Sequence, residues 1–398
     1  MCLSPFPLIF ENQFGERESV DAPCGKCLEC VKEDQNSWKV RMIEESKDWP
    51  YCYFFTLTYR DTSLPVNVVD TYNCKIKTRC RFCDDAADSY GYEVLSSGFK
   101  KDVQDWIKRF RTRYVRRKAY SLGMTVKDFK ASSGLYTKLK PTLRYFICLE
   151  YGPNGTHRPH YHGCLFTNVS PRDIGILPAD WFNHHGFVKW SRVRPRNDAA
   201  NALSAPANYV SKYCCKGEFS SRTDDIEKGY IDKAWRLVSK GLGASYIARK
   251  RDYHLPPRRG YKSQEYIDLV CNRRIYKDGE YKYKLPRYYQ QRLYYARKKE
   301  IKSAFDPKAR SFKAKTIYRY VPTTYISIQI KATLRKRALA RSLEREAEIR
   351  ALYPSYSDAE VYRELALLEV RSRVSRQKVI RSKLNRFYAD NARKHPEL

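Results

Sequence analysis

Blocks of apolar and polar residues predict both strands and helices in the first 217 residues. The segments Tyr51–Tyr59 and Leu143–Tyr151 are rich in aromatic and β-branched residues, which favours strands. Asn154-Gly155 favours a turn into a further strand, His157–Phe166, so these last two strands are expected to form a hairpin. Between Lys101 and Lys118, lysine and arginine fill one helical face, and apolar residues fill the other: Val103, Trp106, Ile107 and Phe110.

Four weaker segments complete this part of the chain. Ser37–Lys47 and Pro171–Phe182 favour helices, and Gly186–Val193 favours a strand. A helix is also expected from Ser204, as its N-cap, to Gly217, with Pro206 in its first turn. Strands and helices in this order predict an α+β fold, an antiparallel sheet with helices packed on it.

Three regions are predicted along the chain. Residues 1–50 hold a cysteine cluster and a helix, and residues 51–217 form the main domain, with a polar, irregular, cysteine-bearing insertion at about 60–98. Residues 218–398 are expected to form a mainly helical, basic accessory region. Within it, residues 297–320 hold nine lysines and arginines against two acids, and Ser357–Glu360 is a capping-box pattern that opens a helix.

Composition points to a polyanionic partner. The 398 residues carry 77 lysines and arginines against 44 acids, a formal net charge of +33, and 33 tyrosines that suit stacking on unpaired bases. A solvated basic surface is the simpler explanation of the charge alone. No apolar run reaches the roughly 18 residues of a membrane span, and residues 1–10 lack the features of a signal peptide. Thirteen cysteines argue for thiols or metal ligands, so a cytosolic protein without membrane contact is expected.

Two histidines share one face of the predicted strand. Alternate strand positions point to the same side, so His160 and His162 can bind one metal ion while Tyr161 packs inward. Glu150, at the end of the neighbouring hairpin strand, can add an oxygen ligand. Two imidazoles and one carboxylate suit Mg²⁺ or Mn²⁺ beside a phosphate, although a single histidine in a strand is usually structural.

Two tyrosines share one face of the predicted helix from Ser204. Tyr209 and Tyr213 lie one turn apart, and Lys212 and Lys216 follow each of them by three residues. A phenol has a pKa near 10 and needs a nearby cation to react as phenolate, which the lysines can supply. By default, such a pair is simply one face of an amphipathic helix. Beside a metal, it suits breaking a phosphodiester and holding the broken end covalently.

The cysteine spacing suggests a structural zinc site. Cys24, Cys27 and Cys30 form a C-x-x-C-x-x-C cluster that Cys2 could complete to four thiolates. A second arrangement joins Cys24 and Cys27 with Cys80 and Cys83. The third possibility is that these are ordinary thiols, some of them buried.

At these residues the chain resembles a known family, the HUH endonucleases, and in particular the replication initiators of gokushovirus-type microviruses. The resemblance runs from Cys24 to about Tyr295. It rests on the histidine motif, the double-tyrosine helix and these outer segments: Pro23–Cys30, Phe55–Tyr59, Val103–Phe110, Glu150–Gly152 and Leu285–Tyr289.

The resemblance implies rolling-circle replication in a bacterial host's cytoplasm. Tyr209 or Tyr213 would attack the origin phosphate, leaving a 5′-phosphotyrosine link and a free 3′-OH that host polymerase extends. The other tyrosine would cut the regenerated origin, and strand transfer would then release a circle. The partners expected are single-stranded and origin DNA, host polymerase and helicase, with no small-molecule cofactor.

Two alternatives stay open. One keeps the chemistry and changes the context: a plasmid initiator, a relaxase or a two-tyrosine transposase. The other is a non-catalytic, zinc-stabilised DNA-binding protein with structural histidines.

Overall fold

The computed structural model describes most of the chain in two compact units. The described residues are 6–11, 17–25, 27–81, 91–152, 158–193, 207, 210–211, 223–258, 262–278, 281–306, 311–321, 325–365 and 367. One unit is formed by residues 38–244, and the other by residues 1–37 with 245–397. Each unit is described by itself below.

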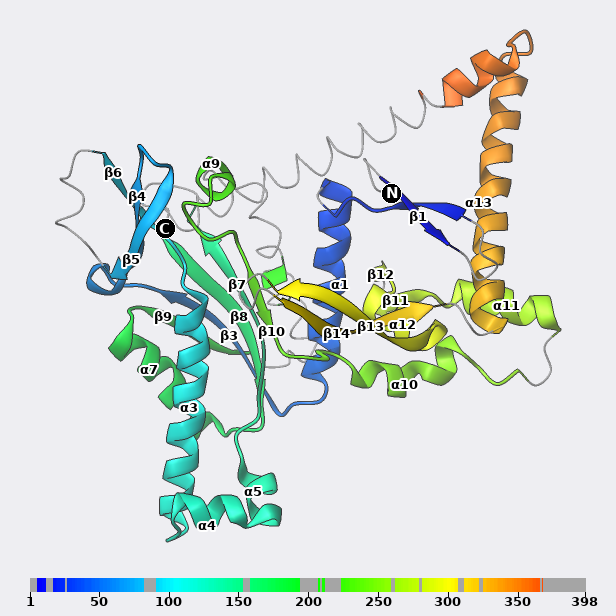
Figure 1. Cartoon of the computed structure of the whole chain (residues 1–398). Helices are drawn as coiled ribbons and strands as arrows, with labels where there is room; N and C mark the ends of the chain where they lie inside the picture. The colour runs from blue at the N-terminus through cyan, green and yellow to red at the C-terminus, as the bar shows by residue number, and fades with distance from the viewer. Residues whose placement is uncertain are drawn as a thin grey trace. The chain divides into compact units, whose positions relative to one another are not determined.

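A five-stranded antiparallel sheet is the centre of the 38–244 unit (Figure 1). The strands, in spatial order, are β10 (Arg236–Val238), β7 (Leu143–Tyr151), β8 (Pro159–Thr167), β3 (Tyr51–Thr58) and β9 (Val188–Val193). The predicted α+β fold and the predicted hairpin of β7 and β8 are confirmed. β10 lies beyond residue 217, so the sheet draws on a segment that the sequence pattern assigned to the accessory region.

One face of the sheet is covered by α3 (Lys100–Ser121) and α7 (Ile176–His184), with the short α6 (Pro171–Ile174) just before α7. The apolar stripe of α3 is buried as predicted, since Val103, Trp106, Ile107 and Phe110 are each at most 3% exposed. Trp106 packs edge-on against both Phe55 of β3 and Trp181 of α7. This aromatic core fixes the sheet against its helices.

The other face is covered by the end of α1 (Leu28–Ser46) and by residues near position 210. Met42 and Ile43 of α1 form one apolar cluster with Phe146 of β7, and Ala207 and Val210 join the same cluster. The predicted amphipathic stretch Ser37–Lys47 is therefore helical, within a longer helix.

The predicted insertion at 60–98 is not irregular, which corrects the sequence-based expectation. β4 (Pro65–Asp70), β5 (Lys75–Arg81) and β6 (Tyr92–Ser96) form a separate three-stranded sheet in the order β5-β4-β6, preceded by the short helix η1 (Asp61–Ser63). All but the last residue of β4 are buried. Because both faces of β4 are covered, its residues do not alternate between apolar and polar, which hid the strand.

Beyond α3, the short helices α4 (Val126–Ala131) and α5 (Ser133–Leu139) close a small cluster around Phe129. The last helix of the unit is α9 (Thr223–Glu227), which precedes β10. No described helix is long and apolar enough to cross a membrane.

The second unit mixes helices with three hairpins. Its helices are α10 (Ser245–His254), α11 (Ser263–Asn272), α12 (Arg287–Tyr294) and α13 (Tyr325–Leu352). Its hairpins pair β1 (Phe6–Glu11) with β2 (Arg17–Ala22), β11 (Ile275–Asp278) with β12 (Tyr281–Lys284), and β13 (Ala296–Asp306) with β14 (Ser311–Val321).

The basic stretch 297–320, expected to be helical, is therefore the β13–β14 hairpin, while the predicted capping box is confirmed because Ser357 and Glu360 bond reciprocally.

Candidate active site

The register of the central sheet brings the predicted metal ligands onto one face. His160 lies opposite Glu150 of β7 and opposite Thr58 of β3, while His162 lies opposite Cys148 and Thr56. Directly opposed residues in antiparallel strands share a face, so His160, His162 and Glu150 point to the same side. This is the face on which Val210 also packs.

The side chains of this face are hydrogen-bonded in a defined way. His162 Nε2 lies 3.0 Å from Glu150 Oε2, and both residues are only 6% exposed. Each histidine has a threonine at its other ring nitrogen: Thr56 Oγ1 is 3.0 Å from His162 Nδ1, and Thr58 Oγ1 is 3.3 Å from His160 Nδ1. These threonines orient both rings, as the outer-shell partners of metal-binding histidines do.

The donor set fits a divalent cation by chemistry, but it is open. The two imidazole rings lie 6.5 Å apart between centroids. Among the residues that the structure describes, only a cysteine cluster brings three donor atoms within 4.8 Å of one another. His162 and Glu150 are at bonding distance, and His160 stands beside them at the strand's beginning.

Tyr161 faces the opposite side, as predicted, and takes no part in the histidine face. Its side chain is fully buried, and its hydroxyl lies 2.8 Å from that of Tyr59, which donates to Asp102 at 2.6 Å. Burial raises the pKa of Tyr161 well above its usual value, so this phenol is not a nucleophile near neutral pH.

The predicted nucleophiles Tyr209 and Tyr213, with Lys212 and Lys216, lie outside the described residues. Their described neighbours show where the segment runs. The Val210 carbonyl accepts a hydrogen bond from the Cys148 thiol at 3.6 Å, and the same thiol lies 3.4 Å from the carbonyl oxygen of His162. The backbone between the two tyrosines therefore crosses the sheet on the histidine face, beside His162.

Sequence reasoning missed several residues of this face. Thr56 and Thr58 carry a detectable signal, because Phe-Thr-Leu-Thr alternates and puts both hydroxyls on the side away from the aromatic core. Lys189 of edge strand β9 lies opposite Thr56 and is exposed, and Phe187, 60% exposed, gives its carbonyl to the Thr58 amide. Only the strand order reveals these two, since β9 joins β3 from far along the chain.

The cysteine cluster of the other unit has the geometry of a metal site. The sulfurs of Cys24, Cys27 and Cys30 lie within 4.8 Å of one another, and the Cys27 amide donates to Cys24 Sγ at 3.3 Å. Cys2, the predicted fourth ligand, lies outside the described residues, as does Cys83. Cys80 is disulfide-bonded and so offers no thiolate, which favours the arrangement without it.

Comparison with known proteins points in one direction. Residues 52–218 match the family model of the replication-associated protein ORF2. The chain is also 24% identical over 286 residues to the replication-associated protein ORF2 of Spiroplasma virus 4, covering 68% of this chain and 67% of that protein. The matched family region begins in β3 and ends just after the double-tyrosine motif, so it contains both halves of the candidate site. No solved structure matches the chain.

Proposed function

We propose that this protein is a viral rolling-circle replication initiator of the HUH type, which nicks one strand of replicative-form DNA and later rejoins it. Its similarity to replication-associated proteins supports the replication role. The nicking chemistry rests on one observation: the backbone between Tyr209 and Tyr213 contacts the strand that carries His162.

The proposed reaction is a transesterification. The phenolate oxygen of one tyrosine attacks the scissile phosphorus, the bond to the 3′ oxygen breaks, and that oxygen takes a proton to become the free 3′-OH. Mg²⁺ or Mn²⁺ held by His160, His162 and Glu150 would neutralise charge on the phosphate. Thr56 and Thr58 keep the imidazoles turned toward it, and Lys212 and Lys216 favour the phenolate.

Two tyrosines allow two successive cuts. One holds the 5′ phosphate of the displaced strand while host polymerase and helicase extend and unwind from the 3′ end. The other cuts the regenerated origin, and the new 3′-OH attacks the first phosphotyrosine to close a circle. In this proposal the reaction takes place in the cytoplasm of a bacterial host, and Cys24, Cys27 and Cys30 hold a structural zinc ion.

The test is covalent capture. Wild-type protein, incubated with Mn²⁺ and a labelled oligonucleotide of its own origin, should give a protein–DNA adduct that survives denaturing electrophoresis. Tyr209→Phe with Tyr213→Phe should abolish the adduct, and His160→Ala should weaken it and make it less responsive to added metal. Tyr120→Phe, at an 88% exposed tyrosine of α3, is the matched control and should behave as wild type.

An adduct retained by the double tyrosine variant would move the nucleophile elsewhere. Wild-type protein that forms no adduct would favour a non-catalytic DNA-binding protein.

A further inference from the structure

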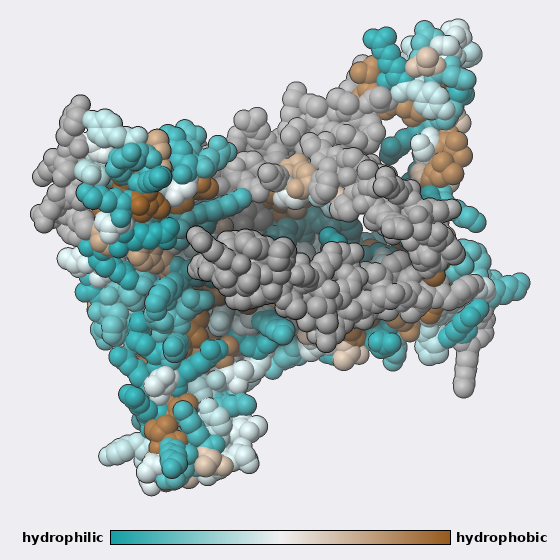
Figure 2. All heavy atoms as spheres, viewed as in Figure 1, coloured by the Kyte–Doolittle hydropathy of each residue, from teal (hydrophilic) through white to brown (hydrophobic). Residues whose placement is uncertain are grey.

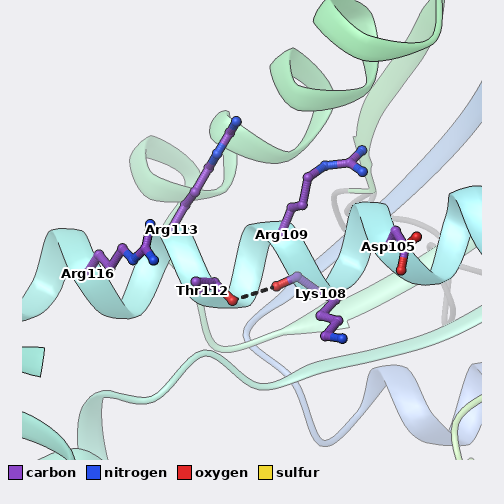
Figure 3. Close-up of a pocket in the computed structure, with 6 residues that line it drawn as sticks. All are labelled: Asp105, Lys108, Arg109, Thr112, Arg113 and Arg116. Atoms are coloured by element: carbon purple, nitrogen blue, oxygen red, sulfur yellow. Dashed lines mark hydrogen bonds between the residues drawn. The ribbon is translucent and has the colours of Figure 1, made fainter. Parts of the chain in front are cut away.

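The outward side of α3 carries a basic pocket of about 430 Å³. Figure 3 shows its six lining residues on successive turns of the helix: Asp105, Lys108, Arg109, Thr112, Arg113 and Arg116. Four of the six are cations and one is an acid. In the space-filling view, hydrophilic side chains cover most of the visible surface over α3 (Figure 2).

This pocket lies away from the histidine face. The inward side of α3 packs on the sheet face that holds Phe55, Leu57 and Tyr161. His160 and His162 alternate with Tyr161 along β8, so they point to the other side of the sheet. DNA bound in the α3 pocket would therefore contact the unit at a second place, with the sheet between it and the proposed cut.

Two of the pocket's arginines are fixed in place. Arg109 Nε lies 2.9 Å from Asp180 Oδ2 and Arg113 Nη1 lies 2.5 Å from Asp180 Oδ1, and the Asp180 side chain is fully buried beneath them. Figure 3 shows both arginines rising from the same side of the helix. Because the buried carboxylate anchors both guanidinium groups, little side-chain entropy remains to be lost when an anion binds.

The other two cations are exposed. Lys108 and Arg116 are two turns apart on α3, with Thr112 between them, and among the described residues neither has an acidic partner within ion-pair distance. One buried acid and one rim acid do not balance four cations, so the pocket keeps a net positive charge.

The shape of this charge favours phosphates along a nucleic-acid backbone. Lys108, Thr112 and Arg116 follow one another at about 6 Å per step, a row of donors and not a single cage. The lining contains no aromatic residue on which an unpaired base could stack, whereas single-strand sites combine cations with aromatics. Phosphate contacts of this kind position a duplex without reading its sequence.

We propose that this pocket binds the phosphate backbone of double-stranded DNA flanking the nick, at a second contact site remote from the histidine face. The inference rests on the proposed action on DNA, but it does not depend on the nicking chemistry.

The experiment compares charge removal in and outside the pocket. Lys108→Gln with Arg116→Gln leaves the buried Asp180 pairs intact. Lys127→Gln with Lys130→Gln, two exposed lysines of α4 in the same unit, is the matched control. The dissociation constant for a labelled DNA duplex of random sequence is measured against salt concentration, and oligo-dT serves as the single-stranded probe.

The pocket variant should bind duplex several-fold more weakly, and its salt slope should fall by about 1.8, at roughly 0.9 per lost phosphate contact. The control should keep the wild-type slope. Covalent capture of the single-stranded origin oligonucleotide should be the same in all three proteins. A binding defect would support the inference even if no protein formed an adduct.

Three results would overturn the inference: an unchanged slope in the pocket variant, an equal loss in the α4 control, or an equal loss on oligo-dT. Loss of single-strand capture in the pocket variant would instead make α3 part of the cutting site.

Discussion

At the scale of single residues, the threonines of β3 are the least expected part of the site. A histidine binds metal through one ring nitrogen, so the partner of the other nitrogen sets the ring's orientation and tautomer. Thr56 and Thr58 contact Nδ1 of His162 and His160, respectively. They are positioning residues for the proposed chemistry, acting through the imidazoles.

Thr56→Val should therefore impair the site without unfolding the protein. Valine has a similar shape and favours strands, so only the contact with His162 Nδ1 is lost. We expect covalent capture to slow by about 10- to 100-fold, with partial recovery as Mn²⁺ is raised, the range typical of lost outer-shell partners.

Thr78→Val, at an exposed position of β5, makes the same chemical change away from the site. Equal rates in both variants across the Mn²⁺ titration would remove the positioning role from Thr56.

At the scale of elements, the histidine strand depends on Gly163. A Cβ at this position would lie 2.3 Å from Cζ of Phe55, which is fully buried and packs against Trp106 and Trp190. The phenyl ring cannot move outward, because tryptophans occupy the space around it. Glycine lets β8 approach the aromatic core of β3 closely, which sets the position of the histidines next to it.

Gly163→Ala should destabilise the 38–244 unit by about 1–3 kcal/mol, the range for overpacked cores. Urea unfolding should show a lower midpoint at an unchanged slope. Gly134→Ala in α5, where a Cβ meets open space, should be neutral or slightly stabilising. A Gly163→Ala protein as stable as wild type would mean that the packing around Phe55 is looser than described.

The elements that the sequence predicted well are those whose own residues carry the pattern. β3, β7, β8 and α3 each bury one clear face or a long apolar run. The three-residue strand β10 carries no pattern of its own, since it exists only because β7 offers an unpaired edge. The ligand face followed from alternation within β8, whereas the contact of Val210 with Cys148 needed the folded chain.

At the scale of the whole molecule, the chain divides so that the candidate zinc cluster and the histidine face belong to different units. A structural metal stabilises the unit that holds its ligands, because the unfolded chain binds it weakly. Metal removal should therefore act on one unit first.

Purified protein should contain about one zinc ion per chain by elemental analysis, and Cys27→Ser should lose it. A chelator should lower the melting temperature of one of two calorimetric transitions in wild type and have no further effect in Cys27→Ser. Cys74→Ser, at an exposed cysteine outside the cluster, should keep the zinc. Zinc-free wild-type protein, or zinc retained by Cys27→Ser, would contradict this assignment.

The order of strands also decides where the endonuclease unit can be cut out of the chain. β10 returns after the double-tyrosine segment to cover the outer edge of β7, with the Leu149 amide bonded to Trp235 and the Ser239 amide to Tyr145. A fragment that stopped at residue 218, where the family match ends, would leave a row of backbone groups open to pairing with another molecule. An expression boundary for this unit alone therefore belongs after residue 244, because a shorter fragment would aggregate through its uncovered edge.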